Sequence, residues 1–159
     1  MPAAVARDLT AAHRRPIARV AEGQWLAAQP AVHAMMDLSD GLATDLGHVC
    51  RESGVGARVR ADRVPVSEAT RQAARALGED VLGWAISGGE DYELLVALDA
   101  GEAARVAAGL LAATGTPLTL VGEITGPGEP MPIFVDERGT ALAMGPGYEH
   151  FRPAGRRGG

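Results

Sequence analysis

The chain has 159 residues, of which 47% are apolar and 22% charged, a length and composition typical of one globular domain. Its 20 acidic and 15 basic residues give a formal net charge of −5, and the basic residues are scattered, which disfavours binding along a nucleic-acid backbone. All 15 basic residues are arginines, which excludes a P-loop lysine, a Schiff-base lysine and a lysine general base.

The amino-terminal part of the sequence predicts a linker followed by a single domain. Residues 1–16 are rich in Ala and Arg and end in a proline, which disfavours a helix at the residue before it, so we expect a linker here. The domain itself is expected to span residues 17–152. The glycine-rich residues 153–159 predict a disordered tail.

Within this domain, helical and extended patterns alternate along the chain. Apolar residues recur at the spacing of one helix face from Leu42 to Cys50, and Asp45 falls outside this stripe. Strict alternation over residues 55–61 predicts a half-buried strand. The other predicted elements are a helix over 19–29, a buried strand over 32–38, a helix over 67–77, a strand over 92–98, a helix over 100–114, a strand over 118–124 and a hairpin of 133–135 with 142–144.

This order of elements predicts the fold class. Strands that alternate with helices and are followed by a late hairpin favour an α/β (α+β) sandwich with a mixed β-sheet flanked by helices. No internal repeat is visible.

Cysteine usage and hydropathy favour a cytoplasmic protein. Cys50 is the only cysteine, so it has no disulfide partner in the chain and no CxxC motif for zinc. No stretch approaches the roughly 18 apolar residues that a membrane-spanning helix requires, and the amino terminus lacks an apolar signal core. We therefore expect no membrane span and no export signal.

The first candidate site is the segment that follows the predicted strand over 32–38. Asp37 and Asp40 flank the hydroxyl of Ser39 just before a helix begins, and phosphates bind at such junctions because free amides point outward. Carboxylates there would repel phosphate unless a cation such as Mg²⁺ bridged them. The alternative is that Ser39 or Asp40 only caps the helix.

A second candidate is the segment Ser87-Gly88-Gly89-Glu90-Asp91. Paired glycines allow the backbone to approach a ligand closely, and the acids follow where a strand is predicted to begin. A tight turn with solvated acids explains the same pattern.

A third candidate is the glycine-rich loop Gly145-Pro146-Gly147-Tyr148-Glu149-His150-Phe151. Its two aromatic rings could stack on a flat ligand or close one end of the core. His33 and His48 have no Cys or His partner at zinc-ligand spacing, and no G-x-S-x-G motif supports a hydrolase nucleophile.

Four segments together closely resemble the thiamine-monophosphate kinase family. They are HRRPIARVAEGQWLA, AMMDLSDGLATDLGHVCRESGVGARV, ISGGEDYELLVAL and GYEHF, which run from about residue 13 to residue 151. The resemblance covers only the second domain of these kinases, so an amino-terminal ATP-binding domain rich in metal-binding aspartates is expected to be missing from this chain. It implies the carboxyl-terminal domain of the aminoimidazole-ribonucleotide-synthetase-like fold, in which ATP and its acceptor meet between two domains.

The resemblance also implies a reaction and a set of site residues. The reaction transfers the γ-phosphoryl group of ATP to thiamine monophosphate and gives thiamine diphosphate and ADP. Catalysis of such transfers is largely positioning and charge neutralisation, which suits an acidic site with Mg²⁺. The implied roles are Mg²⁺ ligation by Asp37 and Asp40, ATP binding by Ser39, and substrate binding by Glu90 and by Tyr148 or Phe151, with the role of Asp91 left open.

Two alternatives to the kinase hypothesis remain. The chain could act on another acceptor, as selenophosphate synthetase and hydrogenase-maturation relatives do, although the SGGEDYEL and GYEHF pair favours the kinases. It could also be a non-catalytic remnant or binding module. In either case we expect the chain alone to be inactive or nearly so, and the sequence leaves its oligomeric state open.

Overall fold

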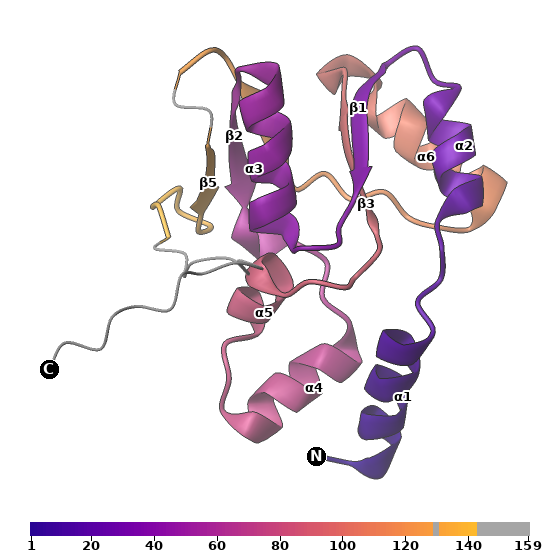
Figure 1. Cartoon of the computed structure of the whole chain (residues 1–159), viewed down its shortest axis with the longest axis vertical. Helices are drawn as coiled ribbons and strands as arrows, with labels where there is room; N and C mark the ends of the chain where they lie inside the picture. The colour runs from indigo at the N-terminus through magenta and orange to yellow at the C-terminus, as the bar shows by residue number, and fades with distance from the viewer. Residues whose placement is uncertain (129–130, 143–159) are drawn as a thin grey trace, which may run out of the picture.

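The computed structural model describes residues 1–128 and 131–142. Helices and short strands alternate along most of this part of the chain (Figure 1). In chain order the elements are α1 (Ala3–Arg14), α2 (Val20–Ala27), β1 (Val32–Asp37), α3 (Leu42–Ser53), β2 (Gly56–Arg60), the 3-10 turn η1 (Ala61–Arg63), α4 (Glu68–Leu77), α5 (Val81–Ser87), β3 (Leu94–Leu98), the 3-10 turn η2 (Ala100–Glu102), α6 (Ala103–Thr114), β4 (Gly122–Thr125) and β5 (Pro132–Val135).

Local signals set the ends of the central helices. The Ser67 side chain accepts a hydrogen bond from the Thr70 amide at 3.0 Å, which caps the start of α4. Both α3 and α4 end at a glycine in the left-handed region, Gly54 with φ of 66° and Gly78 with φ of 72°. These bounds agree with those expected from the sequence.

The strands form two small sheets. β1 and β3 pair antiparallel, with Met35 opposite Val96. In the other sheet β2 lies in the centre, antiparallel to β4 and parallel to β5. The expected α/β class with a mixed sheet is confirmed, but the mixed sheet has three strands and the remaining pair stands apart from it.

Each sheet has its own hydrophobic core. The larger core lies between α3, α5 and the β4–β2–β5 sheet and includes Leu46, Ile86 and Phe134. The smaller core lies between α2, α6 and the β1–β3 pair and includes Leu26 and Leu110. Three connections cross from one core to the other: β1 leads into α3, α5 leads into β3, and α6 leads into β4.

Four expectations differ from the structure. Residues 1–16, expected as a linker, contain the helix α1, which packs against α4 and buries Val5. The strand β1, expected to be buried, has half-buried or exposed side chains. Helix α5 was not expected; Asp80 caps it by accepting from the Leu82 amide at 3.0 Å.

The fourth difference concerns the end of the described chain. The strand expected over residues 118–124 forms only at Gly122–Thr125. The expected hairpin is reduced to β5 and a single bridge between Val135 and Ala141, and its last residues lie outside the described part. No helix in residues 1–128 or 131–142 is long and apolar enough to cross a membrane.

Candidate functional site

Two of the sequence motifs meet where the chain crosses between the cores. One is the segment 38–41, which links β1 to α3, and the other is the segment 88–93, which links α5 to β3. We call these two segments the loop pair. They lie about 50 residues apart in the sequence, so only the tertiary fold brings them together.

Backbone hydrogen bonds join the loop pair. The Glu90 amide donates to the Ser39 carbonyl at 2.8 Å, and the Tyr92 amide donates to the Leu38 carbonyl at 2.8 Å. In return the Leu38 amide donates to the Glu93 carbonyl at 2.8 Å. The pairing of β1 with β3 therefore continues beyond the strands into the motifs themselves.

Glycines make this close approach possible. A Cβ on Gly89 would lie 2.5 Å from the Ser39 carbonyl oxygen, and a Cβ on Gly41 would lie 2.8 Å from the Gly88 carbonyl oxygen. Gly41 also has φ of 100°, a backbone conformation that side chains disfavour. Contact with the opposite segment thus explains Gly41 and Gly89, whereas Gly88 lies against the Trp84 carbonyl of the preceding helix α5.

Two residues of the segment 88–93 have unusual backbone conformations. Glu90 has φ of 67° and Tyr92 has φ of 52°, in the left-handed region that favours glycine. Such conformations cost of the order of 1–3 kcal/mol each and persist where surrounding contacts hold them. Here the amides of both residues are hydrogen bonded to the opposite segment, which fixes the direction in which the Glu90 side chain leaves the backbone.

The residues predicted to bind metal and phosphate lie in the other segment of the loop pair, residues 38–41, or directly before it. Asp37 is the last residue of β1 and is exposed, whereas Ser39 and Asp40 are half-buried. The N-cap residue of α3 is Gly41, and no side chain caps this helix. The alternative that Ser39 or Asp40 serves as the helix cap is therefore wrong.

The structure adds Asp45, which the sequence analysis placed away from the buried face of α3. Asp45 is only 2% exposed, and its Oδ2 accepts a hydrogen bond from the Asp40 amide at 3.0 Å. Burial raises the pKa of the Asp45 carboxyl, the negative charge of Asp40 adds to this rise, and nearby backbone amides oppose it. An acidic residue in the first turn of a helix is a weak signal for such a contact.

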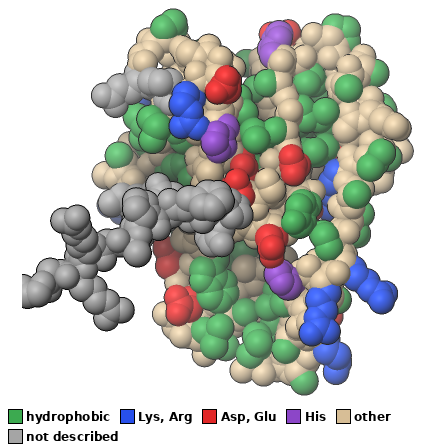
Figure 2. Space-filling view, viewed as in Figure 1, with side chains coloured by type: hydrophobic (Ala, Val, Ile, Leu, Met, Phe, Trp, Pro, Cys, Tyr) green, Lys and Arg blue, Asp and Glu red, His purple; other side chains and the backbone are tan. Residues whose placement is uncertain are grey.

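Glu90 also contacts helix α1. His13 Nδ1 lies 3.3 Å from Glu90 Oε2, with both side chains more than half exposed, so this pair contributes little to stability. Acidic side chains gather near the middle of this face of the molecule, and arginines lie toward its lower right edge (Figure 2).

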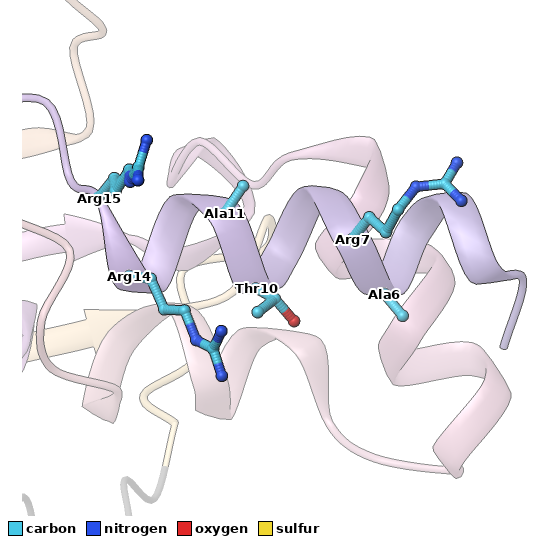
Figure 3. Close-up of a pocket in the computed structure, with 6 residues that line it drawn as sticks. All are labelled: Ala6, Arg7, Thr10, Ala11, Arg14 and Arg15. Atoms are coloured by element: carbon cyan, nitrogen blue, oxygen red, sulfur yellow. The ribbon is translucent and has the colours of Figure 1, made fainter.

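A surface hollow runs along α1 but is separate from the predicted site residues. Helix α1 and the residue that follows it, Arg15, line the hollow, and the arginine side chains there point in different directions rather than toward one point (Figure 3). The lining residues are Ala6, Arg7, Thr10, Ala11, Arg14 and Arg15.

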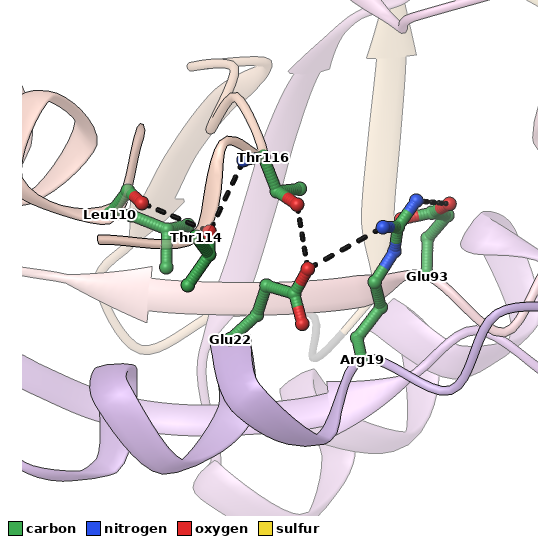
Figure 4. A network of polar contacts seen from close by, with 6 residues as sticks. All are labelled: Arg19, Glu22, Glu93, Leu110, Thr114 and Thr116. Atoms are coloured by element: carbon green, nitrogen blue, oxygen red, sulfur yellow. Dashed lines mark hydrogen bonds and ion pairs between the residues drawn. The ribbon is translucent and has the colours of Figure 1, made fainter. Parts of the chain in front are cut away.

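A network of side chains holds the segment 88–93 from its other end (Figure 4). Arg19 donates from Nε to Glu93 Oε2 at 2.9 Å and from Nη2 to Glu93 Oε1 at 2.7 Å, a two-pronged contact. Its Nη1 lies 3.4 Å from Glu22 Oε1, which also accepts a hydrogen bond from the Thr116 hydroxyl at 2.6 Å. We call Arg19, Glu22, Glu93 and Thr116 the Arg19 network.

The pKa values of Glu22, in the Arg19 network, and of the nearby Asp91 are shifted in opposite directions. The Thr116 hydroxyl, a backbone amide and the charge of Arg19 lower the pKa of Glu22. Burial and the neighbouring Glu93 charge raise the pKa of Asp91. No sequence pattern indicated this network beyond the presence of the charged residues themselves.

Asp37 and Asp40 offer the donor chemistry of a partial magnesium site. Within residues 1–128 and 131–142 no group of three or more His, Cys, Asp or Glu side chains is placed to hold a metal ion. Two carboxylates nevertheless fit Mg²⁺, which binds proteins through one or two carboxylates and takes its other ligands from phosphates and water. Tyr148 and Phe151, the predicted ring contacts, lie outside the described residues.

Comparison with known proteins assigns the domain. Residues 8–132 match the family described as AIR synthase related protein, C-terminal domain. The thiamine-monophosphate kinase of Escherichia coli O157:H7 is 39% identical over 142 residues, which make up 87% of this chain and 41% of the relative. That of Rhodopirellula baltica is 36% identical over 123 residues, 77% of this chain and 38% of the relative. The chain thus spans about two fifths of the length of these relatives.

Solved structures give the same assignment. A thiamine-monophosphate kinase from Stenotrophomonas maltophilia is 35% identical with a TM-score of 0.72, over 89% of this chain and 42% of that one. A ThiL protein complexed with AMPPCP and TMP is 25% identical with a TM-score of 0.73, over 95% of this chain and 43% of that one. The HypE protein of E. coli, at 23% identity and a TM-score of 0.66, shares the fold over 87% of this chain and 41% of its own. The chain therefore belongs to the AIR synthase related protein family, carries its C-terminal domain, and is similar within that domain to the thiamine-monophosphate kinases.

Proposed function

We propose that this chain is the C-terminal half of an ATP-dependent thiamine-monophosphate kinase. The observation that carries the proposal is the hydrogen bond from the Glu90 amide to the Ser39 carbonyl, which joins the motif expected to bind substrate to the motif expected to bind ATP and metal. The similarity to curated kinases over 87% of the chain supports the same reaction. The reaction transfers the γ-phosphoryl group of ATP to the phosphate of thiamine monophosphate.

In this proposal each predicted site residue has one task. Asp37 and Asp40 would hold Mg²⁺, which neutralises phosphate charge when bound. Ser39 would donate its hydroxyl proton in a hydrogen bond to an ATP phosphate oxygen. Glu90 would contact thiamine monophosphate, and Tyr148 or Phe151 would contact its rings.

The chemistry requires no general base from this chain. The attacking phosphate oxygen of thiamine monophosphate is already ionised at neutral pH, so positioning two anions against each other is the main task. A second domain would supply the remaining metal-binding residues and the rest of the ATP site. We place the reaction in the cytoplasm, which the single, unpaired Cys50 supports.

Complementation tests this proposal. We expect no turnover by the chain alone, and production of thiamine diphosphate when it is mixed with a separately produced amino-terminal kinase domain, ATP, Mg²⁺ and thiamine monophosphate. If the two parts associate but make no thiamine diphosphate, the kinase proposal fails and a non-catalytic binding module is the better description.

Substitutions at the acidic pair test the metal role in the complemented enzyme. Asp37→Asn and Asp40→Asn keep the side-chain size and remove one charge each, so we expect activity to fall at least about 100-fold. Because neither carboxylate lies in a core, the free energy of unfolding should change by less than about 0.5 kcal/mol. Asp62→Asn, at an exposed carboxylate paired with Arg60, is the matched control and should retain activity. Full activity in both variants would mean that Asp37 and Asp40 do not bind the metal ion.

A further inference from the structure

One peptide unit at the centre of the loop pair is held from both sides. The carbonyl oxygen of Ser39 and the amide of Asp40 belong to the same planar unit. The carbonyl accepts from the Glu90 amide at 2.8 Å, and the amide donates to Asp45 Oδ2 at 3.0 Å. Two hydrogen bonds at opposite ends of a rigid plane fix its orientation.

The burial of Asp45 needs an explanation that packing does not supply. The side chain is 2% exposed, and its helix neighbours Leu42 and Leu46 belong to the larger core. No arginine or histidine of the described chain forms an ion pair with it. Burying a carboxylate costs free energy unless hydrogen bonds compensate, and an apolar residue here would avoid that cost.

The compensation that Asp45 receives comes from the segment before α3. The carboxylate accepts from the Asp40 amide, whereas the backbone amide of Asp45 makes the ordinary first hydrogen bond of α3, to the Gly41 carbonyl at 2.9 Å. Only the contact with the Asp40 amide therefore depends on the side chain of Asp45. The orientation of the Ser39–Asp40 peptide decides where both of these side chains point, because each leaves from a Cα at one end of that plane.

We propose that Asp45 is a positioning residue that orients the Ser39–Asp40 peptide, so that Ser39 and Asp40 face the phosphate and the metal ion while the same peptide holds Glu90. The metal and phosphate part rests on the proposed function; the hold on the peptide does not. Asp45 acts through Asp40 and is not itself a metal ligand.

Amide hydrogen exchange of this chain, followed by NMR, tests the hold on the peptide. In the unmodified chain the Asp40 amide should be protected. Asp45→Ala removes the acceptor and should speed Asp40 exchange by about 10–100-fold, the factor that corresponds to one hydrogen bond to a charged group. Asp45→Asn retains a side-chain oxygen and should preserve most of the protection.

The matched control removes a carboxylate that also accepts from backbone amides, but far along the chain. Asp136 Oδ1 accepts from the amides of Arg138 and Thr140 at 2.9 and 2.8 Å. Asp136→Ala should leave the exchange of the Asp40 amide unchanged.

Paramagnetic Mn²⁺ then tests the positioning. Added Mn²⁺ should broaden the resonances of residues 37–41 in the unmodified chain, and Asp45→Ala should need roughly 10-fold more Mn²⁺ for the same broadening. Asp45→Asn should stay close to the unmodified chain. An equal loss in both variants would mean that the charge of Asp45 binds the ion directly, which overturns a positioning role.

The remaining outcomes separate this inference from the proposed function. Two results overturn the inference: free exchange of the Asp40 amide in the unmodified chain, or the same exchange rate for this amide in the unmodified chain and in folded Asp45→Ala. The first measurement uses only the unmodified chain, so it does not depend on a variant that might fail to fold. A protected Asp40 amide together with no Mn²⁺ broadening at residues 37–41 supports the hold of Asp45 on the peptide and counts against the metal site of the proposed function.

Discussion

The segment 88–93 is held at its two ends by different kinds of contact. The loop pair relies on backbone hydrogen bonds and on glycines that let two main chains touch. The Arg19 network relies on charged side chains that are partly exposed to solvent. Main-chain contact depends on the absence of a side chain and is insensitive to pH, whereas the network depends on the identity and the protonation of its groups.

The largest effect should come from adding one methyl group to the loop pair. In Gly89→Ala the new Cβ would lie 2.5 Å from the Ser39 carbonyl oxygen, so one backbone must move and the Glu90 hydrogen bond is lost. We expect the free energy of unfolding to fall by about 2–4 kcal/mol. Urea denaturation of the purified chain measures this loss.

A second glycine provides the control for that experiment. A Cβ on Gly101 would meet no atom within 4 Å, so Gly101→Ala should change stability by less than about 1 kcal/mol. If Gly89→Ala were equally harmless, the loop pair would be more deformable than its contacts indicate, and the contrast with the Arg19 network would disappear.

The sequence could predict those features that are set by interactions between residues close together in the chain. The bounds of α3 and α4 were predictable because caps such as Ser67 and stop signals such as Gly54 act within a few residues. The two motifs of the loop pair could also be picked out in the sequence as residue strings; their metal and substrate roles stay predictions. Helix α1 was missed because the proline after it was interpreted as the mark of a linker rather than of a helix end.

The geometry of the site could not be predicted from local pattern. Asp45 lies outside the apolar stripe of α3, and only its contact with the Asp40 amide explains why a carboxylate is buried there. The sequence alone did not explain why positions 41 and 89 are glycines; in the structure each lies against the backbone of the opposite segment. Such contacts join residues far apart in sequence, for which periodicity carries no information.

An intermediate effect is expected when the Arg19 network loses its cation. Arg19→Ala leaves Glu93 and Glu22 without their shared partner, and we expect a loss of about 1–2 kcal/mol after allowance for the exposure of Glu93. Arg19→Lys keeps the charge but cannot make the two-pronged contact, so it should recover only part of this loss. Urea denaturation measures both variants.

The control for this series is an arginine in an exposed ion pair. Arg105 pairs with Glu102 on the surface of α6, and Arg105→Ala should change stability by less than about 0.5 kcal/mol. Equal losses at Arg19 and Arg105 would show that the network adds nothing beyond a surface ion pair.

The smallest expected effect is a change in how the free energy of unfolding depends on pH when Glu22 is replaced. Its pKa in the folded chain is lowered below the ordinary value of 4.5, so its contribution to stability is complete above that pH and is lost as the pH falls through the lowered value. Glu22→Gln removes this contribution. The difference in the free energy of unfolding between the unmodified chain and Glu22→Gln should therefore be constant near neutral pH and shrink below pH 4.5.

Comparing two chains isolates Glu22 from its neighbours. Asp91 has a raised pKa, so its contribution has the opposite sign and is lost as the pH rises, but it is present in both chains and cancels in the difference. Glu79→Gln, at an exposed position outside the network, is the matched control. A Glu22 difference that stays flat through the acidic range would mean that the network is held by hydrogen bonds alone, which would make it resemble the loop pair after all.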